Sequence, residues 1–127
     1  MTVFAAGCFN RVHPAHVRML QSARALGDRL VLVLSNDAHN RKPNAVPAVT
    51  RKKWLEDLGI ADQVLIGDAG SFAAVLLREK PDILALGYDQ RMPDEETARA
   101  VRDLGIEVVV LPWVQGKEEG QSASCLP

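Results

Sequence analysis

Residues 7–16 read Gly-Cys-Phe-Asn-Arg-Val-His-Pro-Ala-His, and they connect the apolar run 3–6 to a segment of helical periodicity at 14–26. The apolar run predicts a strand, the leading glycine a tight turn, and Pro14 the first residue of a helix. Proline is favoured at that position because the N–H it lacks would have no partner inside the helix. A strand, a glycine-led turn and a helix in this order are typical of a parallel α/β sheet.

The same alternation continues along the chain, with each helical segment closed by a glycine or a proline. Further strands are expected at 29–34, 63–66, 83–86 and 107–111, and further helices at 51–58, 72–79 and 94–104. The order βαβαβαβαβ predicts an α/β fold, a single Rossmann-like doubly wound domain whose five-stranded parallel sheet carries helices on both faces.

The predicted helices have recognisable ends. Thr50 and Ser71 are expected N-caps, because their hydroxyls can accept the first free N–H groups of a helix. Gly27 and Gly59 are expected to end the helices before them, Gly27 in the left-handed conformation. Asp94 is expected to be a first-turn acid that complements the helix dipole.

Composition limits the possible classes of protein. The chain has 127 residues, 47% of them hydrophobic, which suits one domain over 1–127 with a loose tail at 113–127. Its 15 basic and 16 acidic residues give a net charge of -1, so we expect no nucleic-acid partner and no membrane association. Only Cys8 and Cys125 contain thiols, which argues against a disulfide scaffold and favours a reducing, cytoplasmic location.

Ligands of parallel sheets bind at the carboxyl ends of the strands, where residues 7–16, 35–50 and 87–90 are expected to lie. The helix start at Pro14 offers N–H groups and a positive dipole end to a phosphate. His13 and His16 flank that helix start, and their ring N–H groups can bind phosphate oxygens. Two alternatives remain open: a zinc site that includes Cys8, and histidines that only cap a surface helix.

Two later segments carry further polar chemistry. A basic stretch follows the second predicted strand, and in a chain of net charge -1 it suits a polyphosphate clamp. It comprises Arg41, Lys42, Arg51, Lys52 and Lys53. For Lys52 and Lys53 we expect a solvated helix face.

The segment after the fourth predicted strand holds Gly87 and Asp89. Gly87 permits close backbone approach, and Asp89 can accept a hydrogen bond from a ribose or a base, or else only cap a turn.

The pattern Gly-x-Phe-Asn-x-x-His-x-x-His resembles the signature of the HxGH nucleotidyltransferases, a superfamily that includes cytidylyltransferases and archaeal-type FAD synthases. Those proteins usually have Gly-Thr-Phe-Asp-x-x-His-x-Gly-His, so Cys8, Asn10 and Ala15 are departures. Lys42-Pro43 with Pro47 and Arg51, and Leu-Gly-Tyr-Asp-Gln at 86–90, look like the FAD synthases.

The resemblance implies transfer of a nucleoside monophosphate from a triphosphate to a phosphorylated acceptor, with release of pyrophosphate. ATP and FMN giving FAD is the favoured pair. The alternatives are a CTP-dependent cytidylyltransferase acting on glycerol 3-phosphate or a similar phospho-alcohol, and a nucleotide-binding module without turnover. Mg²⁺ is expected to accompany the triphosphate, and a homodimer is expected.

By the same resemblance, residues are assigned to two roles. The catalytic set is His13, His16, Lys42 and Arg51. The nucleotide-binding set is Gly7, Cys8, Phe9, His13, Pro14, Ala15, His16, Gly87, Asp89, Ser122 and Ser124. Phe9, Tyr88 and Trp113 have two open roles, either stacking on a flavin or packing in the core or at its rim.

Overall fold

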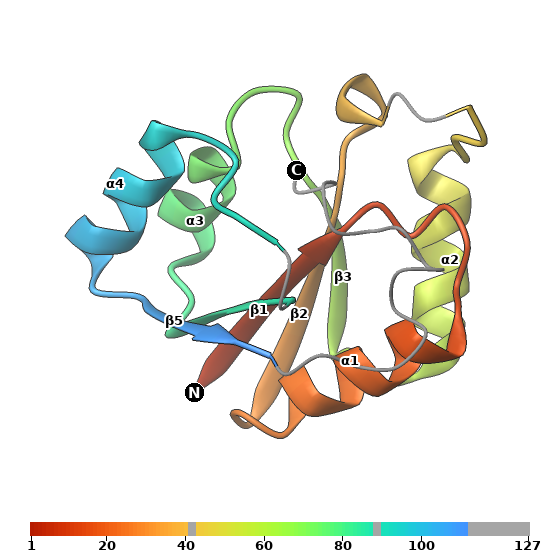
Figure 1. Ribbon diagram of the computed structural model, residues 1–127, viewed down its shortest axis with the longest axis horizontal. Coiled ribbons are helices and arrows are strands. Elements are labelled where there is room, and N and C mark those ends of the chain that lie inside the picture. Colours follow the sequence, from red (N-terminus) through yellow and green to blue (C-terminus); the bar gives the residue numbers. More distant parts are fainter. Residues whose placement is uncertain (41–42, 88–89, 112–127) are drawn as a thin grey trace.

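The computed structural model describes residues 1–40, 43–87 and 90–111, and these build a parallel sheet between helical layers (Figure 1). The strands are Thr2–Gly7 (β1), Arg29–Leu34 (β2), Gln63–Ile66 (β3), Ile83–Leu86 (β4) and Glu107–Val110 (β5). The helices are Pro14–Arg24 (α1), Ala48–Leu58 (α2), Ala73–Glu79 (α3) and Glu95–Leu104 (α4), with a short 3₁₀ helix at Asp37–His39 (η1). The strand order is β3-β2-β1-β4-β5, with every neighbouring pair parallel. The predicted fold class is confirmed.

The sheet separates two apolar layers, because successive side chains of a strand point to opposite faces. Val3 and Ala5 belong to the cluster on the side of α1 and α2, whereas Phe4 and Ala6 belong to the cluster under α3 and α4. Figure 1 shows the two helix pairs on opposite sides of the sheet. β1 lies in the middle, and the strand order reverses beside it, so the loops after β1, β2 and β4 meet at one edge.

The predicted helix starts differ from the observed ones where a distant residue caps the helix. α2 begins at Ala48, three residues before the predicted start, and Thr50 lies inside it. Pro47 provides no side-chain cap, but the carboxylate of Asp37 in η1 accepts the Ala48 N–H at 2.9 Å. That carboxylate also complements the positive end of the helix dipole, which explains the earlier start.

At the starts of α3 and α4, the predicted polar residues Ser71 and Asp94 accept backbone N–H groups, but in positions that differ from the predicted ones. Ser71 Oγ accepts the Ala73 N–H at 3.1 Å, although α3 begins one residue later than predicted. Asp94 is the N-cap of α4 and not a first-turn acid, since its Oδ1 accepts the Thr97 N–H at 2.7 Å.

Gly27 is a correction to the sequence prediction. α1 ends at Arg24, and Gly27 does not adopt the left-handed conformation, whereas Gly59 does, with φ at 69°. A Cβ atom on Gly27 would lie 2.5 Å from the backbone oxygen of Met1 and 2.9 Å from a methyl group of Val3. Glycine therefore occupies position 27 because the chain before β2 passes very close to the start of β1.

Within the described ranges, no helix has both the length and the apolar character that a bilayer span requires.

Candidate active site

The carboxyl edge of the sheet is held together by hydrogen bonds between its loops. The Ser35 N–H donates to Gly7 O at 3.0 Å, which joins the ends of β1 and β2. Gln90, which is buried, donates from Nε2 to Ala6 O at 3.1 Å and accepts the Gly87 N–H at 2.7 Å. The loop after β4 is thereby fixed to β1, so Gln90 has a structural role that its motif alone did not predict.

Phe9 is part of the core, which is one of the two roles that the sequence left open for it. Its side chain is buried, and its backbone is left-handed with φ at 55°. The ring covers Gly7 so closely that a Cβ there would lie 2.8 Å from Cε2 of Phe9. Glycine at position 7 thus makes room for the ring, which also meets His16 edge-on at 5.2 Å between centroids.

Cys8 is also buried. Its sulfur accepts a hydrogen bond from Ser35 Oγ at 3.3 Å.

His13 and His16 cap the start of α1 reciprocally. Nδ1 of His13 accepts the Ala15 N–H at 3.1 Å, and Nδ1 of His16 accepts the His13 N–H at 3.0 Å. A ring nitrogen that accepts a hydrogen bond carries no proton, so these contacts assign the neutral imidazole proton to Nε2 in both residues. In the neutral form, Nε2 is therefore the donor nitrogen of each ring.

The predicted N–H cradle for phosphate at this helix start is not present in the structure. Pro14 has no N–H, the Ala15 N–H is bound to His13 Nδ1, and the His16 N–H is bound to His13 O at 2.8 Å. The positive end of the helix dipole remains, but anion binding here falls to side chains. His13 is partly exposed, whereas His16 and Ala15 have no exposed surface.

Arg51 is an internal connector, which corrects the prediction of a direct phosphate contact. Its side chain is fully buried at 0% exposure. All five guanidinium N–H groups have protein partners. They are Val46 O at 2.6 Å, Cys8 O at 2.7 Å, Ser35 Oγ at 3.2 Å, Ser35 O at 2.9 Å and Asp37 Oδ1 at 3.0 Å. Arg51 thus fixes α2 to the loops that follow β1 and β2.

Asn40 joins the same edge and was missed by the sequence prediction. It is buried at 6% exposure, and its amide forms two hydrogen bonds with the amide of Asn10. A single buried asparagine in a polar loop gives no sequence signal, because its partner is thirty residues away.

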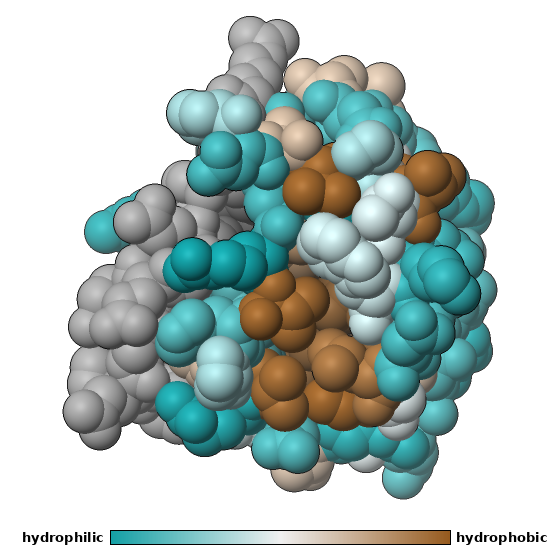
Figure 2. Space-filling model, turned by 90° about the vertical axis from the view of Figure 1, so that its right-hand side faces the viewer, coloured by the Kyte–Doolittle hydropathy of each residue, from teal (hydrophilic) through white to brown (hydrophobic). Residues whose placement is uncertain are grey.

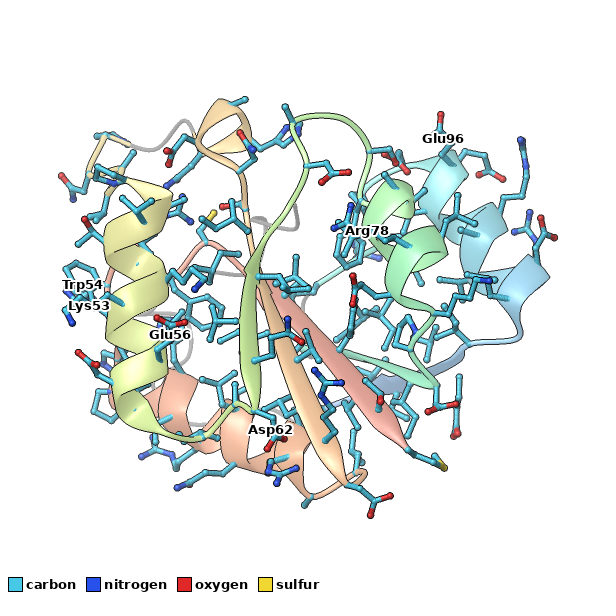
Figure 3. All side chains as sticks on the ribbon, turned by 180° about the vertical axis from the view of Figure 1, so that it is seen from behind. Lys53, Trp54, Glu56, Asp62, Arg78 and Glu96 are labelled. Atoms are coloured by element: carbon cyan, nitrogen blue, oxygen red, sulfur yellow. The ribbon has the colours of Figure 1, made fainter. Side chains whose placement is uncertain are left out.

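The helix face of α2 is solvated, as predicted for Lys52 and Lys53. Lys52 pairs with Glu56 one helical turn later at 2.7 Å. Figure 3 shows Lys53 beside Trp54 on the outward side of α2. Several other predicted residues lie outside the described residues, so their predicted roles stay predictions. They are Arg41, Lys42, Tyr88, Asp89, Trp113, Ser122, Ser124 and Cys125.

An apolar groove of about 430 Å³ lies between the motif loop and α2. Its lining includes Val12, Trp54 and Leu58, and the Trp54 side chain is 40% exposed. Figure 2 shows apolar side chains gathered on this side of the molecule. Trp54 was not among the predicted aromatic residues, yet it presents an exposed ring beside the motif loop.

The described part of the chain contains no group of three His, Cys, Asp or Glu side chains arranged to hold a metal ion. It therefore contains no zinc site built from Cys8, His13 and His16, the alternative that the spacing left open.

Comparison with known proteins adds the family. Residues 4–125 match the family model described as Cytidylyltransferase-like. The FAD synthase of Ferroglobus placidus is 35% identical over 125 residues, which are 96% of this chain and 81% of that protein. The FAD synthase of Methanosarcina barkeri is 39% identical over 115 residues, covering 87% of this chain and 82% of that protein.

Among solved structures, a lipopolysaccharide core biosynthesis protein from Thermoplasma volcanium superposes with a TM-score of 0.80 at 29% identity, over 91% of this chain and 98% of that one. These similarities show that the chain is a nucleotidyltransferase enzyme. Within that class, the chain belongs to the cytidylyltransferase-like family.

Proposed function

We propose that this nucleotidyltransferase transfers AMP from ATP to FMN and forms FAD. The observation that carries the proposal is the reciprocal histidine cap, which places His13 and His16 together at the start of α1, at the carboxyl edge of the sheet. The similarity to FAD synthases over most of the chain supports the choice of substrates.

The reaction requires alignment more than acid–base chemistry. An FMN phosphate oxygen attacks the α-phosphorus of ATP, a new P–O–P bond forms, and the bond to the β-phosphate breaks to release pyrophosphate. The attacking oxygen is already anionic at neutral pH, so no general base is needed. The site then acts by holding the two phosphates close and by stabilising charge on the α-phosphate and the leaving group.

We assign the phosphate contacts to three side chains. The Nε2–H of His13 donates to a phosphate oxygen, and Lys42 supplies a positive charge to the triphosphate. The buried His16 donates from Nε2 to a phosphate that enters deeper into the site, which requires the site to open around it. Arg51 acts indirectly, because its five N–H groups hold the loops that carry the other residues.

The family requires a divalent cation in general, and we propose Mg²⁺. The described residues offer no protein cage for it, since the Asp37 carboxylate is already bound to Arg51 and to the Ala48 N–H. An ion of this kind fits as part of the ATP complex, bound to phosphate oxygens and water. A homodimer and a cytoplasmic location also remain predictions.

The test is FAD formation and pyrophosphate release from ATP, FMN and Mg²⁺, followed by chromatography. The sharpest variant is H13N, because an asparagine keeps an N-cap for Ala15 but removes the Nε2–H donor. We expect kcat/KM to fall about 10²-fold or more, the range for loss of one donor to developing charge. H39A is the matched control, since His39 is exposed on η1 and contacts Gly70 O.

Two results would redirect the proposal. Turnover with CTP and glycerol 3-phosphate but not with ATP and FMN would identify the cytidylyltransferase alternative. ATP binding without pyrophosphate release from any pairing would identify a binding module.

A further inference from the structure

The groove between the motif loop and α2 is lined by exposed apolar side chains from one face of the helix. Trp54 and Leu58 are one helical turn apart and Asp57 lies beside them, so the three side chains share a face of α2. Trp54 is 40% exposed and Leu58 is 38% exposed. Val12 of the motif loop also lines the groove. Neighbouring exposed apolar side chains in a hollow of about 430 Å³ are typical of a ligand site.

Trp54 is the exposed aromatic ring of this groove. The phenylalanines of the described ranges, Phe4, Phe9 and Phe72, are all buried at 1% exposure. In Figure 3 the labelled Trp54 lies on the outward side of α2. A tryptophan ring in an apolar hollow stacks on flat aromatic ligands, and such stacking adds to the free energy of apolar burial. The groove therefore suits the planar ring of a substrate.

The groove is continuous with the histidine-bearing start of α1. Val12 lines the groove, and the next residue is His13, which is partly exposed and caps the helix. In FMN the ribityl chain links the isoalloxazine ring to the phosphate. A ring in the groove therefore leaves the phosphate able to reach His13.

The two substrates of the proposed reaction need different sides of this helix start. Nucleotides in parallel α/β sheets bind where the strand order reverses, which here is between β1 and β4. The groove lies against α2, which packs on β2 and β3, on the other side of β1. Because the attacking and leaving oxygens lie roughly in line across the phosphorus, the acceptor approaches opposite the departing pyrophosphate. The groove is thus placed for the acceptor and not for the nucleotide.

Polar side chains at the groove fit the edge of an isoalloxazine ring. Arg11 and Asp57 both line the groove and are exposed. The pyrimidine edge of the ring carries carbonyl oxygens, which accept from a guanidinium, and an N–H, which donates to a carboxylate. A small phospho-alcohol has no ring and would leave the apolar wall unused. The lining therefore favours a flavin over the alternative acceptor.

We propose that the groove formed by Val12, Trp54, Asp57 and Leu58 holds the isoalloxazine ring of the flavin acceptor, stacked on Trp54; this rests on the proposed function. Trp54 binds the part of the acceptor that is remote from the reacting phosphates. It therefore determines which acceptor is used and takes no part in the transfer step.

The experiment measures binding of lumiflavin, the isoalloxazine ring system without the ribityl phosphate, by quenching of its fluorescence. We expect the wild type to bind it and W54A to bind it about tenfold more weakly or worse, as for other stacking aromatic side chains replaced by alanine. W54F keeps an aromatic face and should bind within about threefold of the wild type. W54L keeps apolar bulk without that face and should bind like W54A. V49A is the matched control, since Val49 is 71% exposed on the same helix and is not part of the groove lining.

Steady-state kinetics separate the acceptor from the nucleotide. W54A should raise the KM for FMN about tenfold and leave the KM for ATP unchanged. An unchanged KM for FMN, or equal increases in both KM values, would overturn the proposal. A W54A variant that alters the oligomeric state in gel filtration but binds lumiflavin normally would also overturn it, because the groove would then be a contact between copies of the chain.

Failure of the flavin groove and failure of the proposed function give different results. A wild type that forms FAD, beside a W54A variant of unchanged affinity for FMN and lumiflavin, would refute the groove alone. A wild type that forms no FAD but binds lumiflavin through Trp54 would refute the proposed function and support the groove as a flavin site. A wild type that neither forms FAD nor binds lumiflavin would refute both.

Discussion

Replacing Arg51 by alanine tests whether this buried cation is the structural connector of the site. The change removes the donors of five hydrogen bonds and leaves three backbone carbonyls, those of Val46, Cys8 and Ser35, without their guanidinium partner. A buried acceptor left unpaired costs about 1–3 kcal/mol. Because water can enter the cavity and satisfy some of them, we expect a total loss of about 3–5 kcal/mol in the free energy of unfolding.

Urea unfolding, followed by circular dichroism and tryptophan fluorescence, measures this loss from the midpoint and the slope. R78A is the matched control, since Arg78 on α3 is 52% exposed and its ion pairs with Asp68 and Glu79 are on the surface (Figure 3). It should change stability by less than about 1 kcal/mol. R51K keeps the charge but has fewer donors, so it should lie between the wild type and R51A.

A loss below about 1 kcal/mol for R51A, with an unchanged slope, would refute the connector role. If R51A does not fold at all, R51K provides the measurement. A stable R51K with normal unfolding but greatly weakened ATP binding would instead support the direct phosphate contact that the sequence suggested.

Two further predictions concern stability. The pKa of Asp94 is affected most by burial, which raises it, but the hydrogen bonds from Thr97 and Ser71 outweigh that effect and hold the pKa below its usual value. Its contribution to stability is therefore full above the unfolded-state pKa and is lost as the pH falls through the lower native value. D94A should lower the free energy of unfolding by about 1 kcal/mol at pH 7. The difference in stability between D94A and the wild type should disappear in acid. A stability difference that persists at low pH would contradict this prediction. G27A should destabilise the folded protein by about 1–3 kcal/mol, because its methyl group meets the Met1 carbonyl. The control G70A, with nothing within 4 Å of the added carbon, should be neutral or slightly stabilising. Equal effects of the two variants in thermal unfolding would show that the close approach at Gly27 is relieved at little cost.

The sequence predicted the sheet well because its strands are continuous apolar runs separated by helices with clear stop residues. It predicted the start of α2 wrongly, because the cap is Asp37, eleven residues away, and local sequence contains no sign of that contact. Gly27 was misassigned for a similar reason, since its neighbour Met1 is distant in sequence.

The site shows the same division between local and distant information. The spacing of His13 and His16 indicated a shared helix entrance, and both residues are there. The full burial of Arg51, by contrast, depends on partners in other loops, the backbone oxygens of Cys8 and Ser35. From the sequence alone, an arginine in a basic stretch that binds a phosphate cannot be distinguished from one that, like Arg51, binds three backbone carbonyls of its own chain.

The central position of β1 has a consequence for how this chain is made in the cell. β1 is the first strand to be synthesised. Its residue Val3 pairs with Leu30 of β2 on one side and with Ile83 of β4 on the other, so both edges of β1 are paired only after residue 83 has been synthesised. At about 5–20 residues per second, its second edge stays open for several seconds on the ribosome. Pairings so distant in sequence also form slowly once the chain is complete. The apolar strands β1 and β2 are thus segments of the nascent chain that need protection from aggregation, even though in the finished enzyme five of the six residues in each strand are buried.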